Sequence, residues 1–316
     1  MEEHPARPDA FCMIGGATGV PARRHLVPRF RTTLAMTIAT TIDAAHAACS
    51  AARRAGKRIG LVPTMGALHE GHLSLVRIVQ AKSDFVVVSI FVNPLQFGPT
   101  EDLSKYPRTF ERDRTLLAKE GVDLIFAPTV AEMYPSRATT YVTVEGLSDR
   151  LDGQSRPGHF RGVTTVVSKL FHVIEPDLAV FGQKDAAQLA IIRRMVRDLN
   201  IPVQIVAGPI VREPDGLAMS SRNAYLNPQQ RKQALVLSRT LRTVQERFQQ
   251  GERCAEKLIA AGREVFTAEP NVRVDYFLVV DPESLEPIAD ITGQALVAVA
   301  AYVGATRLID NIVVKA

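Results

Sequence analysis

Cysteine is scarce in this sequence, which has only three in 316 residues. Cys12, Cys49 and Cys254 lie far apart, their number is odd, and no C-x-x-C pair occurs. A disulfide framework needs paired and regularly spaced cysteines. We therefore expect free thiols in a reducing compartment, with the cytoplasm as the location.

Long apolar runs and a strong charge of one sign are also lacking. No stretch approaches the ~20 apolar residues of a membrane span, so we expect no membrane partner. The first residues carry Glu2, Glu3 and Asp9, which disfavours a secretory signal. The formal net charge of +5 is scattered rather than gathered in a basic stripe. This argues against a nucleic-acid partner and indicates a modest attraction for anionic substrates.

Residues 1–35 differ in composition from the rest of the chain. They mix prolines with glycines and show no sustained periodicity. The run Ile14-Gly15-Gly16-Ala17-Thr18-Gly19 matches neither G-x-G-x-x-G nor G-x-x-x-x-G-K-[ST], and no helical pattern follows it. We therefore expect residues 1–35 to be a flexible extension rather than a phosphate-binding loop.

Short apolar runs alternate with amphipathic segments from Ile59 onward. The sequence predicts strands at residues 59–62, 85–91, 124–127, 178–181 and 203–206. Between them it predicts helices at residues 73–82, 110–120, 164–174 and 185–199. Such alternation implies right-handed βαβ units, so we expect an α/β, Rossmann-like domain with a parallel sheet over residues 36–211. Ligands then bind beyond the carboxyl ends of the strands.

After residue 211 the order of the elements changes. Helices predicted at residues 229–249 and 254–267 precede strands predicted at residues 272–280, 296–302 and 307–314. Helices followed by adjacent strands are typical of an α+β domain with an antiparallel sheet. We expect a smaller C-terminal α+β lid domain over residues 212–316, joined through a turn at Pro214-Asp215-Gly216.

The strongest local pattern is PTMGALHEGHL, from Pro63 to Leu73, between a predicted strand and a predicted helix. His69 and His72 are three residues apart, so they share one face of the first helical turn. Such a terminus presents unpaired N–H groups and the positive end of the helix dipole. Gly66 and Gly71 let the backbone approach a ligand closely. The segment therefore predicts a polyphosphate site.

Two other interpretations of these histidines are weaker. A capped helix with incidental histidines would explain a lone His better than this strand–Gly–His–Gly–His arrangement. A metal site is not favoured either, because H-x-x-H lacks the i, i+4 spacing of H-E-x-x-H and no Cys lies nearby.

Two further segments carry groups suited to a nucleotide. Gly182-Gln183-Lys184-Asp185 follows a predicted strand, where Lys184 can reach a phosphate while Asp185 caps the next helix. Met219-Ser220-Ser221-Arg222 lies in the joining segment and predicts a mobile phosphate clamp. Taken alone, the first is also an ordinary strand–turn–helix and the second an ordinary solvated loop.

Polar groups among apolar neighbours, as a small-molecule pocket requires, occur in NPLQFG at residues 93–98 and RPGHFRG at residues 156–162. Each alone is also compatible with a structural turn. The ordered set MGALHEGH, NPLQFG, RPGHFRGV, GQKD and LAMSSRN resembles the pantothenate synthetase family. H-x-G-H with a distant M-S-S-R resembles, more broadly, the adenylyl-transferring superfamily that includes class I aminoacyl-tRNA synthetases. The resemblance covers residues 37–316.

This resemblance implies a ligase that joins (R)-pantoate to β-alanine through a pantoyl adenylate, releasing AMP and diphosphate, in pantothenate and coenzyme A biosynthesis. ATP would be bound by Met65, Gly66, Ala67, Leu68, His69, Glu70, Gly71, His72, Gly182, Gln183, Lys184, Asp185, Val211, Met219, Ser220, Ser221 and Arg222. The catalytic residues would be His72, as proton donor or transition-state stabiliser, with His69, Lys184, Ser220, Ser221 and Arg222. Pantoate and β-alanine would be bound by Gln96, Gln188, Asn93, Arg156 and His159. A Mg²⁺ ion with ATP and a homodimer are also implied.

One departure from the family pattern follows G-Q-K-D. Family members carry an aromatic residue and a Gln there, whereas this chain has Ala186 and Ala187. Gln188 is kept, so the pantoate contact is expected to survive. The metal ligands stay open, because Asp113 occupies a position where family members can place a metal carboxylate but has an arginine on each side.

Two other functions compete with the ligase. The ligase needs alignment and positive charge at its phosphates, to be supplied by Mg²⁺ and by His69, His72, Lys184 and Arg222. A nucleotidylyltransferase would pass AMP to a phosphorylated acceptor, but Gln96 and Gln188 in an otherwise apolar pocket lack the cations that such an acceptor needs. A non-catalytic nucleotide-binding module would not need both histidines and M-S-S-R.

Overall fold

A computed structural model of the chain describes residues 36–99, 101, 103–135 and 139–316. All of these residues belong to one compact unit, Thr33–Ala316. The predicted extension at residues 1–35, with Cys12, lies outside the described residues. The division into two domains near residue 212 stays a prediction, although the two sides of this point form separate sheets.

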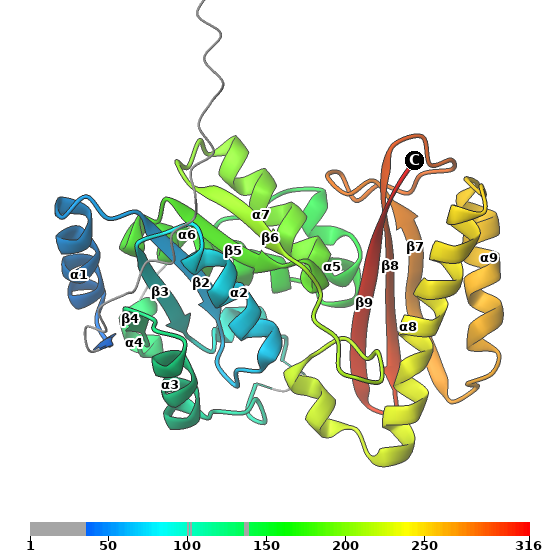
Figure 1. The fold of residues 1–316 in the computed structure, drawn as a ribbon, viewed down its shortest axis with the longest axis horizontal. Helices are drawn as coiled ribbons and strands as arrows, with labels where there is room; N and C mark the ends of the chain where they lie inside the picture. The colour runs from blue at the N-terminus through cyan, green and yellow to red at the C-terminus, as the bar shows by residue number, and fades with distance from the viewer. Residues whose placement is uncertain (1–35, 100, 102, 136–138) are drawn as a thin grey trace, which may run out of the picture. The chain divides into compact units, whose positions relative to one another are not determined.

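The larger sheet is parallel, with the strand order β1-β4-β3-β2-β5-β6 (Figure 1). Its strands are β1 Thr37–Ala39, β2 Ile59–Thr64, β3 Phe85–Ile90, β4 Leu124–Phe126, β5 Leu178–Gly182 and β6 Gln204–Gly208. From β2 the chain first adds strands on one side and later adds β5 on the other. The topological switch point, where open α/β sheets bind ligands, therefore lies between β2 and β5.

Helices cover both faces of the parallel sheet, as crossover connections require. The helices of this part of the chain are α1 Ile42–Arg54, α2 Glu70–Gln80, α3 Phe110–Lys119, α4 Val130–Met133, α5 Asp152–Ser155, α6 His159–Ile174 and α7 Ala186–Asp198, with the short 3₁₀ turns η1 Pro94–Gln96, η2 Leu147–Asp149 and η3 Gln183–Asp185. Leu61 of β2 packs in one core cluster with Ile191 of α7. The next residue, Val62, packs in another cluster with Val76 of α2. The two clusters lie on opposite faces, because consecutive side chains of a strand alternate.

The smaller sheet is antiparallel, in the order β7-β8-β9. It is formed by β7 Val272–Val280, β8 Gln294–Val303 and β9 Thr306–Lys315, and it follows η4 Ser221–Tyr225, α8 Pro228–Gln249 and α9 Ala255–Phe266. Leu237 of α8 and Leu258 of α9 share a core cluster with Phe277 of β7 and Val297 of β8. Both helices thus pack on the same apolar layer (Figure 1).

The predicted fold class is confirmed, and every predicted strand and helix occurs, β7 with the predicted bounds and the others with shifted ends. β1 and α1 were not predicted. Helix α6 begins at His159, five residues before the predicted start, because Phe160 and Val163 extend its buried face through the glycine-containing segment. No helix in the described part of the chain is long and apolar enough to cross a membrane.

Candidate active site

Two cavities adjoin at the carboxyl ends of the central parallel strands. The smaller one, of about 210 Å³, is lined by Thr64 at the end of β2, Gly182 at the end of β5 and Pro209 after β6. The larger one has a volume of about 740 Å³. The two cavities share the lining residues Lys184, Asp185, Gln188, Ser220 and Arg222. This position agrees with the expectation that ligands bind at the switch point of the sheet.

His69 and His72 lie at the start of helix α2. His69 is the N-cap residue and His72 is the third residue of the helix. Their ring centroids are 4.1 Å apart, and both residues line the smaller cavity. The backbone N–H of His69 donates to Nδ1 of His72 in a long contact of 3.4 Å. Because Nδ1 accepts, the neutral His72 ring carries its proton on Nε2.

The surroundings of both rings favour the neutral imidazole. Burial, and then the neighbouring His69, lower the pKa of His72 to about 3. Burial, and then the charge of Lys184, lower the pKa of His69. The positive charge expected of the two histidines therefore stays a prediction, which needs an anion beside the rings to raise their pKa values. Both rings offer hydrogen-bond donors there, and the fixed cations are Lys184 and Arg222.

The turn before His69 is held in shape by a buried carboxylate. Gly66 and Ala67 have φ angles of +83° and +51°. The N–H groups of Ala67 and Leu68 donate to Asp113, over 2.8 and 2.9 Å, and the hydroxyl of Thr109 donates to the same carboxylate. Asp113 is fully buried, and its oxygens are occupied by this turn rather than directed at a ligand.

Gly71 makes room for the His69 ring. A Cβ atom at residue 71 would lie 2.9 Å from both Cε1 and Nδ1 of His69, closer than real Cβ atoms approach. Any side chain there would displace the ring from the cavity wall. The glycine between the two histidines is thus a steric requirement of their placement.

The segment after β5 carries Lys184 and Asp185. It forms the turn η3 and then helix α7. Nζ of Lys184 lies 3.8 Å from Oδ1 of Asp185. Asp185 occupies the N-cap position of α7, but its side chain makes no capping hydrogen bond, so the prediction that it caps the helix is wrong. The reason is that η3 leads directly into α7 and the half-exposed carboxylate faces Lys184 instead.

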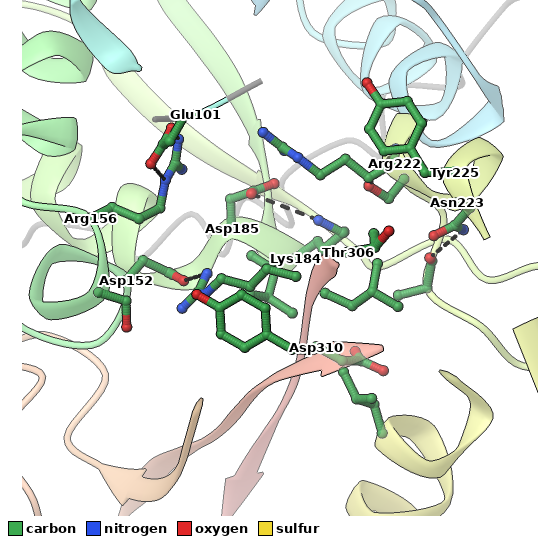
Figure 2. A pocket seen from close by; sticks show the side chains of 18 of the residues that line it. Glu101, Asp152, Arg156, Lys184, Asp185, Arg222, Asn223, Tyr225, Thr306 and Asp310 are labelled. Carbon is green, nitrogen blue, oxygen red and sulfur yellow. Dashed lines mark hydrogen bonds and ion pairs between the residues drawn. The ribbon is translucent and has the colours of Figure 1, made fainter. Parts of the chain in front are cut away.

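The Met219–Arg222 segment returns to the cavity from the joining region. The N–H of Met219 donates to the carbonyl oxygen of Val211 over 3.0 Å, which places these two residues side by side on the wall of the smaller cavity. The N–H of Arg222 donates to Oγ of Ser220 over 3.2 Å. Figure 2 shows Arg222 and Lys184 reaching into the larger cavity from different segments.

The amide of Gln96 is oriented by the fully buried Asn93. The N–H of Leu95 donates to Oδ1 of Asn93 over 3.3 Å, and Nδ2 of Asn93 donates to the carbonyl oxygen of Gly162 over 3.0 Å. A backbone N–H only donates and a carbonyl only accepts, so the orientation of the Asn93 amide is fixed. Its Nδ2 also donates to Oε1 of Gln96 over 2.9 Å. The end of Gln96 that remains for a ligand in the smaller cavity is therefore the Nε2 donor.

Arg156 and His159 line the larger cavity, whereas Gln96 lines the smaller one. Nε and Nη2 of Arg156 donate to the carboxylate of Glu101, over 2.8 and 2.6 Å (Figure 2). Nη2 also donates to the carbonyl oxygen of Gln96, which lies 2.7 Å from Nδ1 of His159. Burial, and then the charge of Arg156, lower the pKa of His159 to about 4. These two side chains brace the segment that carries Gln96.

The predicted ATP-binding residues divide into two groups. The smaller cavity is lined by Met65, His69, Gly71, His72, Gly182, Lys184, Asp185, Val211, Met219, Ser220, Ser221 and Arg222. Neither cavity is lined by Gly66, Ala67, Leu68, Glu70 or Gln183. The carboxylate of Glu70 pairs with Arg77 instead, and Nε2 of Gln183 donates to Asn311 over 3.2 Å.

Several residues of the site were not predicted from the sequence. Tyr106 is buried, lines the smaller cavity and shares a hydrogen bond with the side chain of Ser221. The apolar wall of that cavity comes from Val163, Val166 and Val167 of α6. Their helical spacing was visible, but only the tertiary packing shows that this face meets a cavity. Among the described residues, no group of three or more His, Cys, Asp or Glu side chains is placed to hold a metal ion.

Residues 37–313 match the family described as Pantoate-beta-alanine ligase. The chain belongs to the pantoate-beta-alanine ligase family. The pantothenate synthetase of Koribacter versatilis (strain Ellin345) is 60% identical over 281 residues, which cover 89% of this chain and 97% of that protein. The pantothenate synthetase of Acidobacterium capsulatum is 64% identical over 256 residues, which cover 81% of this chain and 86% of that protein.

Solved structures of this family have the same fold. The pantothenate synthetase from Thermus thermophilus superposes with a TM-score of 0.83 at 49% identity, covering 88% of this chain and 99% of that one. A pantoate-beta-alanine ligase from Francisella tularensis, solved with beta-gamma ATP and beta-alanine, gives a TM-score of 0.72 at 32% identity. It covers 88% of this chain and 97% of that one. The departure at Ala186 and Ala187 is accommodated, because both residues are buried in the core cluster of α7.

Proposed function

We propose that this protein is a pantothenate synthetase, which uses ATP to join (R)-pantoate to β-alanine and releases AMP and diphosphate. The observation that carries the proposal is the make-up of the smaller cavity. His69, His72, Lys184 and Arg222 line a cavity whose wall also holds Gln96 and the valines of α6. A phosphate-binding region thus adjoins a small apolar pocket with amide groups.

In the first step, pantoate reacts as a carboxylate. Such acids titrate at roughly pH 4, so no general base is needed at neutral pH. A carboxylate oxygen attacks the α-phosphorus of ATP, and the bond from that phosphorus to the β-phosphate oxygen breaks. The products are pantoyl adenylate and diphosphate. The protein contributes alignment and stabilisation of the charge that develops on the phosphates.

Donors on both sides of the cavity serve this step. Lys184 enters from the end of β5 and Arg222 from the joining segment, so fixed positive charge approaches the phosphates from two directions. His69 and His72 add N–H donors at the start of α2. A polyphosphate bound beside the two rings would raise their pKa values, because the opposite charge favours the protonated form.

In the second step, the amine of β-alanine attacks the carbonyl carbon of the adenylate. The bond from this carbon to the phosphate oxygen breaks, AMP leaves, and the new ammonium loses a proton to give the amide. The donor end of Gln96 and the amide of Gln188 are suited to the hydroxyl and carboxyl oxygens of pantoate. A small apolar pocket with few polar groups excludes water, which would otherwise hydrolyse the adenylate.

Magnesium is proposed to arrive as part of the ATP substrate. Asp113, the carboxylate considered from the sequence, is occupied by the turn at Ala67 and Leu68. Asp185 lines both cavities and is half-exposed, so it is the acidic group that a metal–nucleotide complex would meet. A metal held by the phosphates needs no dedicated protein site.

A nucleotidylyltransferase remains disfavoured by the surroundings of Gln96. That residue lies with the valines of α6 and with Phe91 and Phe181 in the smaller cavity. A phosphorylated acceptor would need further cations in this part of the wall.

We also propose that the protein acts in the cytoplasm as a homodimer. Sedimentation of the purified protein tests the oligomeric state.

The test is ATP–pyrophosphate exchange with and without pantoate, combined with identification of the products. We expect exchange of label into ATP only when pantoate is present, and without any need for β-alanine. The complete reaction should yield AMP and diphosphate in equal amounts. ADP and orthophosphate as products would contradict the proposal, and so would exchange that ignores pantoate.

A further inference from the structure

Asn311 of strand β9 holds the turn that carries Lys184. Its Nδ2 donates to the carbonyl oxygens of Gln183 and Lys184, over 3.0 and 2.9 Å. Its Oδ1 accepts from Nε2 of Gln183 over 3.2 Å. Asn311 is 2% exposed. One buried amide of the antiparallel sheet therefore pairs with backbone and side-chain groups of η3, which belongs to the parallel-sheet part of the chain.

The neighbouring Asp310 holds the segment that leads to Met219. Its two carboxylate oxygens accept from Nη1 and Nη2 of Arg212, over 2.7 and 3.0 Å. Nη1 of Arg212 also donates to the carbonyl oxygen of Gly216 over 3.1 Å. Arg212 forms a β-bridge with Ala218. The carboxylate thus anchors one side of the hairpin whose two ends are the cavity residues Val211 and Met219.

These two anchors are consecutive residues of an edge strand. Consecutive side chains of a strand point to opposite faces, so the pair reaches two segments at once. Asp310 itself lines the larger cavity, as Lys184 does (Figure 2). Both side chains are buried and are hydrogen-bonded within the protein, so they act on the site through the segments that they hold.

We propose that Asp310 and Asn311 are positioning residues for ATP, which together set the placement of Lys184 relative to Arg222. This inference rests on the proposed function, because it takes the segments at 182–185 and 211–222 as the ATP site. The C-terminal sheet acts on the phosphates through its edge strand without touching them. Loss of either anchor lets one cation-bearing segment move while the pantoate wall formed by α6 keeps its place.

The test compares Asn311→Asp and Asp310→Asn with the wild-type protein. Asn311→Asp keeps the shape but sets a carboxylate oxygen against the two carbonyls, and Asp310→Asn removes the charge that holds Arg212. We expect the KM for ATP to rise about tenfold or more in each. The KM for pantoate should stay within about twofold of wild type in Asp310→Asn. In the Asn311 variants it should rise less than the KM for ATP, because Gln188 follows η3 in α7. If Asn311→Asp does not fold, Asn311→Ser takes its place in the test. The serine side chain is too short to reach the two carbonyls, and it buries no charge.

Asp275→Asn is the matched control. Asp275 lies on β7, accepts from Nε and Nη2 of Arg307 over 2.9 and 2.8 Å, and accepts from the hydroxyl of Ser155 of α5. It lines neither cavity. The same substitution there removes a comparable ion pair of the same sheet. We expect a similar fall in melting temperature but an unchanged KM for ATP.

Hydrogen exchange provides a readout besides activity. We expect the amides of residues 183–187 to exchange faster in the Asn311 variants, and those of residues 211–219 to exchange faster in Asp310→Asn. An unchanged KM for ATP in variants that melt like Asp275→Asn would overturn the inference and leave the proposed function standing. If the wild-type protein itself shows no pantoate-dependent ATP–pyrophosphate exchange, it is the proposed function that fails.

Discussion

The carboxylate of Asp113 accepts a hydrogen bond from the backbone N–H of Ala67 over 2.8 Å, and this bond holds Ala67, a non-glycine residue, at a φ of +51°. Such a conformation costs on the order of 1 kcal/mol or more and persists only where the surroundings fix it. The same carboxylate accepts from Leu68. The turn that delivers His69 to the cavity thus depends on a residue of helix α3, which is distant in sequence.

Asp113→Ala should weaken both the fold and the reaction. Two buried N–H groups lose their acceptor, at a cost of about 1–3 kcal/mol each in the free energy of unfolding. The turn relaxes, so turnover should fall by more than about tenfold even at temperatures where the variant is folded. Denaturant unfolding and steady-state turnover measure the two effects.

Thr109→Val is the control for this prediction. It removes the hydroxyl that donates to Asp113 over 3.1 Å but leaves both bonds to the turn. We expect a loss of about 1 kcal/mol in unfolding free energy, with turnover close to wild type. If Asp113→Ala kept normal turnover, the carboxylate would serve stability alone.

His72→Gln should lower turnover on the order of 10²–10³-fold, as for removal of one preorganised donor. It should also change how stability depends on pH. The folded-state pKa of His72 is about 3, below the ordinary value of 6.5. The unfolded chain therefore binds a proton that the folded chain does not, and stability falls as the pH drops from about 6.5 toward 3.

Unfolding free energies measured between pH 7 and pH 4 isolate this contribution. Wild type should lose stability more steeply than His72→Gln over that window. His159, whose pKa is lowered to about 4, also makes stability fall as the pH drops, but it contributes equally to both proteins. Parallel curves for the two proteins would show that His72 is not buried as a neutral ring.

Asn93→Asp should reverse the polarity of the Gln96 amide. An aspartate has only acceptors when ionised, so Nε2 of Gln96 would turn toward residue 93 and its Oε1 toward the cavity. We expect the KM for pantoate to rise about tenfold, with the KM for ATP little changed. Both KM values are obtained by varying one substrate while the other is kept at a saturating concentration.

Tyr134→Phe is the matched control for Asn93→Asp. The hydroxyl of Tyr134 donates to Oδ1 of Asn93 over 2.8 Å, but Leu95 and Gly162 fix the amide without it. The KM for pantoate should therefore stay within about twofold of wild type. A higher KM for ATP instead of pantoate in Asn93→Asp would show that Gln96 does not face pantoate.

The sequence predicted the parallel sheet well because its strands are buried on both faces. Val86 and Val88 are fully buried, so that segment appears as a short apolar run, and helices follow with a clear period. β1 was not predicted because its three residues, Thr37–Ala39, are too few to show a period. Its pairing with β4 depends on a tertiary contact.

The candidate site was predicted where chemistry is concentrated in short segments. The spacing of His69 and His72 was sufficient to place both rings at one helix terminus. The supports of these segments could not be predicted, because Asp113 and Asn311 act from elements distant in sequence. For the same reason the pairing of Arg156 with Glu101 could not be predicted, while its role toward the substrate stays a prediction.

The most direct test of the stepwise adenylate mechanism is the amount of diphosphate released in a rapid-quench experiment with ATP and pantoate but no β-alanine. A bound adenylate predicts one diphosphate per active site, then a near stop, and immediate turnover when β-alanine is added. Wild type and His72→Gln should be compared, since the variant should slow the first release. If diphosphate appears only when β-alanine is present, the stepwise adenylate mechanism is wrong for this protein.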